Sequence, residues 1–203
     1  MKQSAGGRTV QVLIALGKSV CYLALFLGAQ VLVMLPVVVA AAVQSALENW
    51  EAAEQLSGVL YESAMLFTAV SGLLAIGVIL LFYRIRRKKL GDALWLRRVE
   101  GPGLLSGAAL APALYLAVTV AMMALPEAWL DSYAEASSGV SGGGVIGIVA
   151  VVLVAPVVEE FIFRGLIMTR LAQAMPGWLA AALSAAIFGL CHGHPVWFAY
   201  TFV

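Results

Sequence analysis

Long apolar stretches constrain the fold of this chain more than any other feature of its sequence. A helix that crosses a bilayer needs about 20 mostly apolar residues, because the hydrocarbon core is about 30 Å thick. Three stretches reach that length, a fourth carries two glutamates near its end, and a fifth is shorter: Val20–Val43, Ala64–Tyr83, Gly103–Leu125, Val145–Phe163 and Trp178–Cys191. The chain turns apolar again after Pro195. We expect an all-α, polytopic transmembrane helix bundle with about five spans and the start of another.

The composition excludes a water-soluble domain. Hydrophobic residues make up 63% of the chain and charged residues 11%, and the mean hydropathy is +0.98. Soluble domains are about half apolar and about a quarter charged. No segment between the spans is long enough to fold separately, so the sequence predicts one membrane domain. Within it, residues 1–144 form the N-terminal helices and loops, and residues 145–203 form a C-terminal region that carries the chemistry.

The Lys and Arg residues are divided unevenly among the connecting segments. All 12 lie near the N-terminus, after the second span, or in and just past the end of the fourth. The connections after the first and third spans contain only acidic charged residues. Because cytoplasmic loops are the basic ones, we expect a multi-pass protein of the cell membrane with a cytoplasmic N-terminus. The basic run Arg84–Lys89 fits an anchor to anionic lipid, and we expect no nucleic-acid partner.

The fourth span contains ionisable side chains that are costly in a bilayer. A charged group at the centre of a spanning helix costs about 2.5–3.5 kcal/mol even on the mildest scale, so such residues usually have a function. Glu160 and Arg164 are spaced i,i+4 and share one helix face, where they can pair. Glu159 points about 100° away from Glu160 and is free for another task. Pro156 lacks an N–H and can kink the helix just before the glutamates.

The fifth span ends with another functional candidate, His192. Phe188 and His192 are also spaced i,i+4, so they lie on the same face. His194 has no spacing that gives it a role, and we interpret it as an interfacial residue. The expected topology places His192 and Glu159 at different depths, unless the fourth span runs steeply or re-enters the membrane.

These residues resemble two motifs of a known family. Glu159-Glu160-x-x-x-Arg164 and Phe188-x-x-x-His192 are similar to the first two motifs of the CPBP intramembrane proteases, which include CAAX prenyl endopeptidases and bacteriocin-processing (Abi) proteins. The resemblance covers about residues 145–203. It implies an intramembrane endopeptidase with a protein or peptide substrate in the membrane. The candidate roles are processing of prenylated CAAX proteins and bacteriocin processing or immunity.

The resemblance also implies roles for the four ionisable residues. Glu159 would be the general base that activates a water molecule, His192 would be its partner, and Glu160 and Arg164 would order the site. The family has been called metalloproteases, yet the implied chemistry does not require a metal. Zinc could be held by Glu159 and His192, but catalytic zinc sites usually have three protein ligands. We therefore expect no required cofactor.

The third motif of the family, a His followed four residues later by Asn or Asp, is missing after His194. Its implied role is to stabilise the oxyanion. Residues Val196–Val203 would form only about 12 Å of helix, too little to cross the hydrocarbon core. We expect that the native chain continues past Val203, and that the 203-residue chain alone is inactive or nearly so.

Three other interpretations stay open. Gly139-Val-Ser141-Gly142 matches the signature of rhomboid serine proteases, with His192 as the base, but it leaves the glutamates unexplained. Intramembrane Glu, Arg and His also mark transporters and proton relays. A non-catalytic immunity or scaffold protein could share the protease fold. Replacing Ser141 or Glu159 by Ala, and measuring ion-gradient-dependent uptake, would separate these interpretations.

Overall fold

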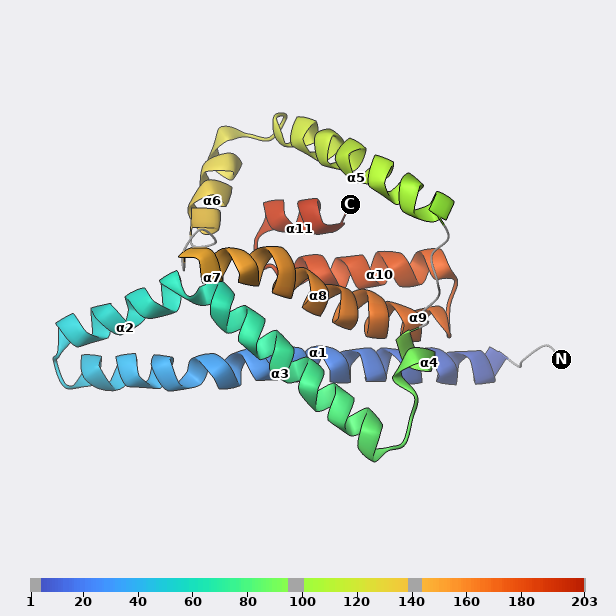
Figure 1. The fold of residues 1–203 in the computed structure, drawn as a ribbon, viewed down its shortest axis with the longest axis horizontal. Coiled ribbons are helices and arrows are strands. Elements are labelled where there is room, and N and C mark those ends of the chain that lie inside the picture. Colours follow the sequence, from blue (N-terminus) through green and yellow to red (C-terminus); the bar gives the residue numbers. More distant parts are fainter. Residues whose placement is uncertain (1–4, 95–100, 139–143, 203) are drawn as a thin grey trace.

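The computed structural model describes residues 5–94, 101–138 and 144–202, and these form helices and turns without a strand. Figure 1 shows their arrangement. The elements are α1 Ala5–Ala46, α2 Trp50–Glu62, α3 Ala64–Ile85, α4 Leu90–Leu94, α5 Gly101–Met122, α6 Glu127–Ser138, α7 Gly144–Val149, the π-helix η2 Ala150–Val154, α8 Ala155–Glu159, the π-helix η3 Glu160–Met168, α9 Thr169–Ala172, α10 Gly177–Leu190 and α11 Pro195–Phe202. The predicted all-α class is confirmed.

Four helices in the described part of the chain are long and apolar enough to cross a membrane, which confirms the predicted polytopic helix bundle. They cover Gly7–Ala46, Ala64–Ile85, Gly101–Met122 and Gly144–Ala172. The element predicted as a short fifth span is α10, a helix of 14 residues. This is less than the ~20 residues that a full crossing needs.

The first helix is longer than a crossing requires. Its 42 residues extend about 63 Å at 1.5 Å per residue, about twice the hydrocarbon thickness. α2 folds back along α1, so the acidic segment after the first span is a helix in a hairpin rather than a loop (Figure 1). Glu48 makes the turn with a φ of 58°, and the Asn49 side chain caps α2 by accepting a hydrogen bond from the Ala52 N–H at 3.3 Å.

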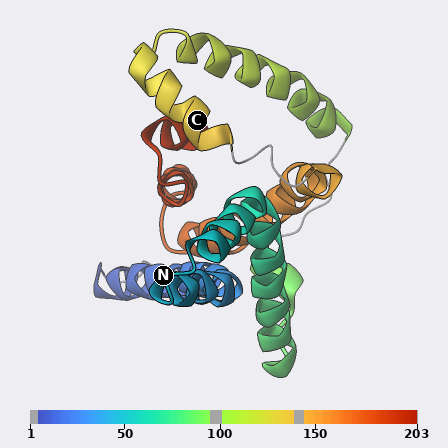
Figure 2. The same ribbon diagram turned by 90° about the vertical axis from the view of Figure 1, so that its left-hand side faces the viewer.

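The fourth span, α7 through α9, is the centre of the packing. Its side chains Ile162, Leu166, Ile167 and Leu171 are fully buried, and α1, α3, α4 and α10 all contact it. Close packing of this kind drives helix association in a bilayer, where lipid tails are as apolar as leucine. α5 does not take part in this packing, because none of its residues is buried. It lies apart from α1 and α3 in both views (Figure 2).

Candidate active site

The fourth span is not a regular α-helix where it carries its glutamates. The π-helices η2 and η3 flank α8, so that Glu159 is the last residue of α8 and Glu160 is the first of η3. Pro156 has no N–H to continue the hydrogen-bond ladder. Turns of π-helix, with bonds from residue i to i+5, are rare and frequently occur at functional sites. The sequence predicts a kink at Pro156. In the structure, the π-helix η2 gives way to the α-helix α8 just before this residue.

Glu159 and His192 lie near one another in the structure, although the expected topology puts them at different depths unless the fourth span runs steeply or re-enters. The fourth span continues to Ala172 instead of ending near Phe163, so Glu159 lies close to the midpoint of a 29-residue helix. The chain then returns as α10, which ends after only 14 residues. Because α10 is short, His192, in the turn just past its end, lies close enough to interact electrostatically with Glu159.

α10 packs antiparallel to η3. Ser184 donates a hydrogen bond from Oγ to the carbonyl oxygen of Phe163 at 2.8 Å. The ring centroids of Phe163 and Phe188 are 4.9 Å apart. Glu159 stands four residues before Phe163, and His192 stands four residues after Phe188. Since the two helices run in opposite directions, Glu159 and His192 meet about one turn beyond the phenylalanine contact.

Glu159 and His192 are the candidates that the structure brings together. Both side chains are half-buried, and the Glu159 carboxylate interacts electrostatically with His192 and Arg164. Nδ1 of His192 lies 2.9 Å from the carbonyl oxygen of Phe188. Because a carbonyl oxygen only accepts, Nδ1 carries the hydrogen, and Nε2 of the neutral ring holds the lone pair. One helix turn thus fixes both the orientation and the tautomer of His192.

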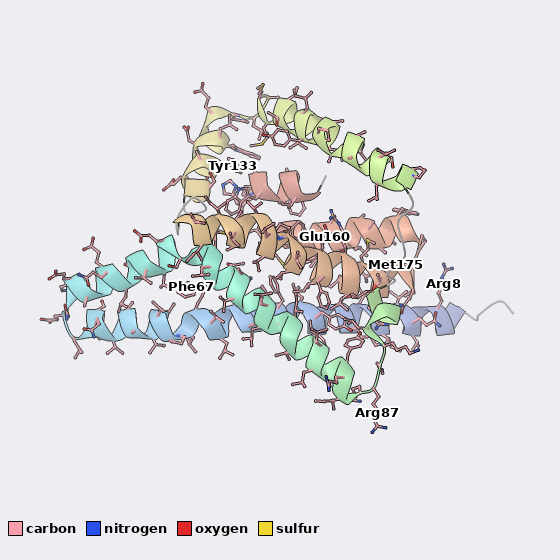
Figure 3. The ribbon with its side chains drawn as sticks, in the orientation of Figure 1. Arg8, Phe67, Arg87, Tyr133, Glu160 and Met175 are labelled. Carbon is pink, nitrogen blue, oxygen red and sulfur yellow. The ribbon has the colours of Figure 1, made fainter. Side chains whose placement is uncertain are left out.

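Glu160 and Arg164 form the predicted ion pair, in which Arg164 Nη1 donates to Glu160 Oε1. The side chains are 55% and 68% exposed, respectively, and Figure 3 labels Glu160 near the middle of the fourth span. Glu159, by contrast, is half-buried and interacts with His192. The two neighbouring glutamates therefore occupy different faces, as the helical spacing predicts.

Sequence reasoning gave no role to His194, but the structure does. Its Nδ1 accepts a hydrogen bond from the Val196 N–H at 3.3 Å, so Nε2 carries the hydrogen and donates to Ser132 Oγ at 2.9 Å. Tyr133, the next residue of α6 (Figure 3), lies edge-on to Trp197 of α11 with centroids 6.2 Å apart. The ring centroids of Trp197 and His192 are also 6.2 Å apart. No spacing in the sequence indicated that α6 reaches this region.

The described residues of this site supply fewer donors than a catalytic zinc ion usually has. No group of three or more His, Cys, Asp or Glu side chains within residues 5–94, 101–138 and 144–202 is arranged to hold a metal. Glu159 and His192 supply two donors, whereas catalytic zinc sites usually have three protein ligands. The rhomboid-type candidate Ser141 lies outside the described residues.

Comparison with known proteins gives one match. The family model for type II CAAX prenyl endopeptidase, Rce1-like, matches residues 141–203, which include both motifs. Neither the curated proteins nor the solved structures contain a match to this chain. Residues 141–203 are therefore similar to the family of Rce1-like type II CAAX prenyl endopeptidases. The resemblance predicted from the two motifs is confirmed for this region.

Proposed function

We propose that this protein is an intramembrane endopeptidase in which Glu159 and His192 activate a water molecule for attack on a peptide bond. The observation that carries the proposal is the meeting of a half-buried Glu159 and His192 near the midpoint of the fourth span. A carboxylate and an imidazole inside a membrane bundle are a costly arrangement, and such groups usually have a function. The match of residues 141–203 to a family of membrane endopeptidases supports it.

In the proposed reaction, Glu159 carries one proton from the attacking water to the amide nitrogen of the substrate. The Glu159 carboxylate takes a proton from the water, and the water oxygen forms a bond to the carbonyl carbon of the substrate. Nε2 of His192 accepts a hydrogen bond from the same water and so orients it, because Nδ1 is held by Phe188. Glu159 then gives its proton to the amide nitrogen as the carbon–nitrogen bond breaks. General acid–base catalysis of this kind contributes about 10²–10⁴-fold in rate.

Glu160 and Arg164 would position the site rather than react. Their ion pair links the first turn of η3 to the next, on a helix whose hydrogen-bond ladder changes beside Glu159. Arg164 also interacts electrostatically with the Glu159 carboxylate. Loss of Arg164 would leave Glu160 unpaired and remove a positive charge near the base. We propose that this pair keeps Glu159 directed towards His192.

The proposed substrate is a prenylated protein with a CAAX end, the class that the matched family's description names. A bacteriocin leader and another membrane protein are the alternatives. We further propose that the N-terminus is cytoplasmic, because the basic residues lie on that side of the expected topology. A proton relay is less well supported, because Glu159, Glu160, Arg164 and His192 gather in one part of the bundle instead of following one another across it.

The test compares the wild type and variants of the full-length protein, each purified from its native membrane and reconstituted into liposomes. A farnesylated CAAX peptide, a bacteriocin leader peptide and a single-span peptide serve as probes, and mass spectrometry identifies the cleavage products. Glu159→Gln keeps the shape of the side chain but removes the base, so we expect the rate to fall at least 10²-fold. Glu51→Gln, an exposed change on α2, is the control and keeps the wild-type rate.

Each other result would select a different function. Equal rates for wild type and Glu159→Gln would refute the glutamate mechanism. Cleavage that Ser141→Ala abolishes would indicate a serine protease. If no probe is cleaved but a proton or ion gradient drives uptake into the liposomes, the protein is a transporter. Absence of both activities would indicate a non-catalytic protein on the protease fold.

A further inference from the structure

A pocket separate from the Glu159 site lies between the N-terminal part of α1 and the end of the fourth span. Its volume is about 200 Å³, well above the ~10–15 Å³ that one water molecule needs. Four polar side chains line it, two from each segment: Gln11 and Lys18 from α1, and Arg170 and Gln173 from α9 and the turn after it. The remaining lining residues are Ile14, Ala15 and Ala174. The pocket is therefore lined by two cations and two amides, and by no acidic residue.

The charges of this pocket have no counter-charge among the described residues. Neither Lys18 nor Arg170 forms a salt bridge with a carboxylate in this part of the chain. Arg170 instead donates from Nη2 to the Tyr83 hydroxyl at 2.9 Å and from Nη1 to Gln173 Oε1 at 3.3 Å, and both partners are neutral. Its Nε is buried, and no group in the described part of the chain forms a hydrogen bond with it. An arginine near the end of a membrane span usually has an anionic or carbonyl partner.

Arg170 is held firmly in this position. The Tyr83 hydroxyl, which accepts its hydrogen bond, is also 2.8 Å from the Tyr22 hydroxyl. The guanidinium is thereby tied to both α1 and α3. Because the side chain is pre-positioned, a ligand would not have to order it, which lowers the cost of binding. Lys18 is exposed at the rim and adds a mobile charge.

The depth of the pocket fits the headgroup layer of a membrane. Lys18 stands two residues before Val20, where the apolar stretch Val20–Val43 begins, and Arg170 stands two residues before the end of the fourth span. One pocket contains residues of both segments, so the N-terminal part of α1 and the end of the fourth span lie on the same face of the bundle. Basic pockets between transmembrane helices commonly bind phosphate headgroups. Guanidinium and ammonium groups pair well with phosphate oxygens, and amides add neutral hydrogen bonds.

We propose that the pocket formed by Gln11, Lys18, Arg170 and Gln173 binds a phosphate group, supplied by the headgroup of an anionic phospholipid. The lipid phosphate provides the missing counter-charge for Arg170 and Lys18, while its acyl chains lie along the exposed apolar side chains of α1 that follow Lys18, such as Val20. The bound lipid ties the end of the fourth span to α1. This proposal concerns a site outside the glutamate pair, and it stands or falls independently of the proposed protease activity.

Native mass spectrometry of the full-length protein in detergent tests the proposal. The probes are phosphatidylglycerol, phosphatidylcholine and inorganic phosphate. We expect one phosphatidylglycerol to bind in preference to phosphatidylcholine, and Lys18→Gln to weaken this binding about fivefold, the effect of one cation near an anionic group. Lys89→Gln is the comparison variant, because it removes the same charge from an exposed lysine of the basic run Arg84–Lys89, outside the pocket, and we expect it to weaken the binding less than Lys18→Gln does. Gln11→Glu, an exposed change that adds a repelling carboxylate, weakens binding as well.

The arms of the experiment separate the sources of the phosphate. Binding of phosphatidylglycerol that millimolar inorganic phosphate does not displace supports a lipid site. Displacement by inorganic phosphate, with the same dependence on Lys18, supports the phosphate chemistry and assigns it to a soluble ligand. Equal effects of Lys18→Gln and Lys89→Gln would show only general attraction to a basic surface and would overturn the proposal. Equal binding of the two lipids would overturn it too.

Discussion

Replacing Gly72 by Ala tests how closely α3 supports the candidate base. A Cβ atom at Gly72 would lie 2.6 Å from Cγ1, 2.9 Å from Cγ2 and 3.2 Å from Cβ of Val158. Carbon atoms in contact are normally about 3.5–4.0 Å apart, so the two helices must separate by about 1 Å. Val158 cannot turn away easily, because β-branched side chains in helices have one strongly preferred rotamer. It directly precedes Glu159, so the displacement reaches the carboxylate.

Two quantities follow from this contact. Overpacking of a core costs about 1–3 kcal/mol, while the change from glycine to alanine in a helix returns about 0.5–1 kcal/mol. We therefore expect Gly72→Ala to lower the free energy of unfolding by about 1–2 kcal/mol, and to lower Tm by about 2–4 °C per kcal/mol. A displacement of about 1 Å at a catalytic group costs about 10²-fold in rate. Thermal unfolding in detergent and the liposome cleavage assay measure the two effects separately.

The same helix supplies the control. A Cβ atom added at Gly77 would meet no atom within 4 Å, and this glycine is exposed, so Gly77→Ala should leave Tm unchanged or slightly raised. The double variant Gly72→Ala with Val158→Ala removes both Cγ atoms and should recover part of the lost rate. The reasoning is refuted if Gly72→Ala is as stable and as active as Gly77→Ala. It is also refuted if removing the Cγ atoms brings no recovery.

Three further variants test individual contacts. Ser184→Ala removes the hydrogen bond to the Phe163 carbonyl and should lower stability by about 0.6–1.7 kcal/mol, the range for interhelical hydrogen bonds in membranes, in detergent unfolding. Tyr83→Phe leaves Arg170 and Tyr22 without their shared partner and should cost about 1–3 kcal/mol, whereas Tyr115→Phe on the exposed face of α5 should cost nothing. His194→Ala breaks the bond to Ser132, so we expect faster amide hydrogen exchange in α6 with little change in Tm; unchanged exchange would show that this bond does not hold α6.

Much of the fold could be predicted, because lipid leaves few alternatives. Apolar length identifies a spanning helix directly, and four predicted spans coincide with helices of the structure. The boundaries were less accurate. The fourth span was expected to stop near Phe163 because charged residues follow there, but Arg164 pairs with Glu160 and Arg170 bonds to Tyr83, so the helix continues to Ala172. The partner of Arg170 comes from another part of the chain, and no local pattern reveals it.

The candidate site could be predicted in its members but not in its geometry. The i,i+4 spacing predicted the Glu160–Arg164 pair correctly, since that contact is local to one helix. The meeting of Glu159 with His192 depends on how far two helices extend and where they touch, at Ser184 and Phe163. The roles of His194 and α6 depend on a contact between residues 62 positions apart. Such long-range contacts require the packed structure.

The π-helix η3 has a consequence for changes in chain length. A turn whose hydrogen bonds join residue i to i+5 holds one residue more than an α-helical turn, yet the segments on either side of it keep their directions. Losing one residue inside η3 would let the ladder return to i→i+4 while Glu159 and Arg170 still face their present partners. The same loss inside α10 would rotate His192 by about 100° around the helix axis and away from Glu159. Among relatives of this chain, loss of one residue should therefore be tolerated better in η3 than in α10.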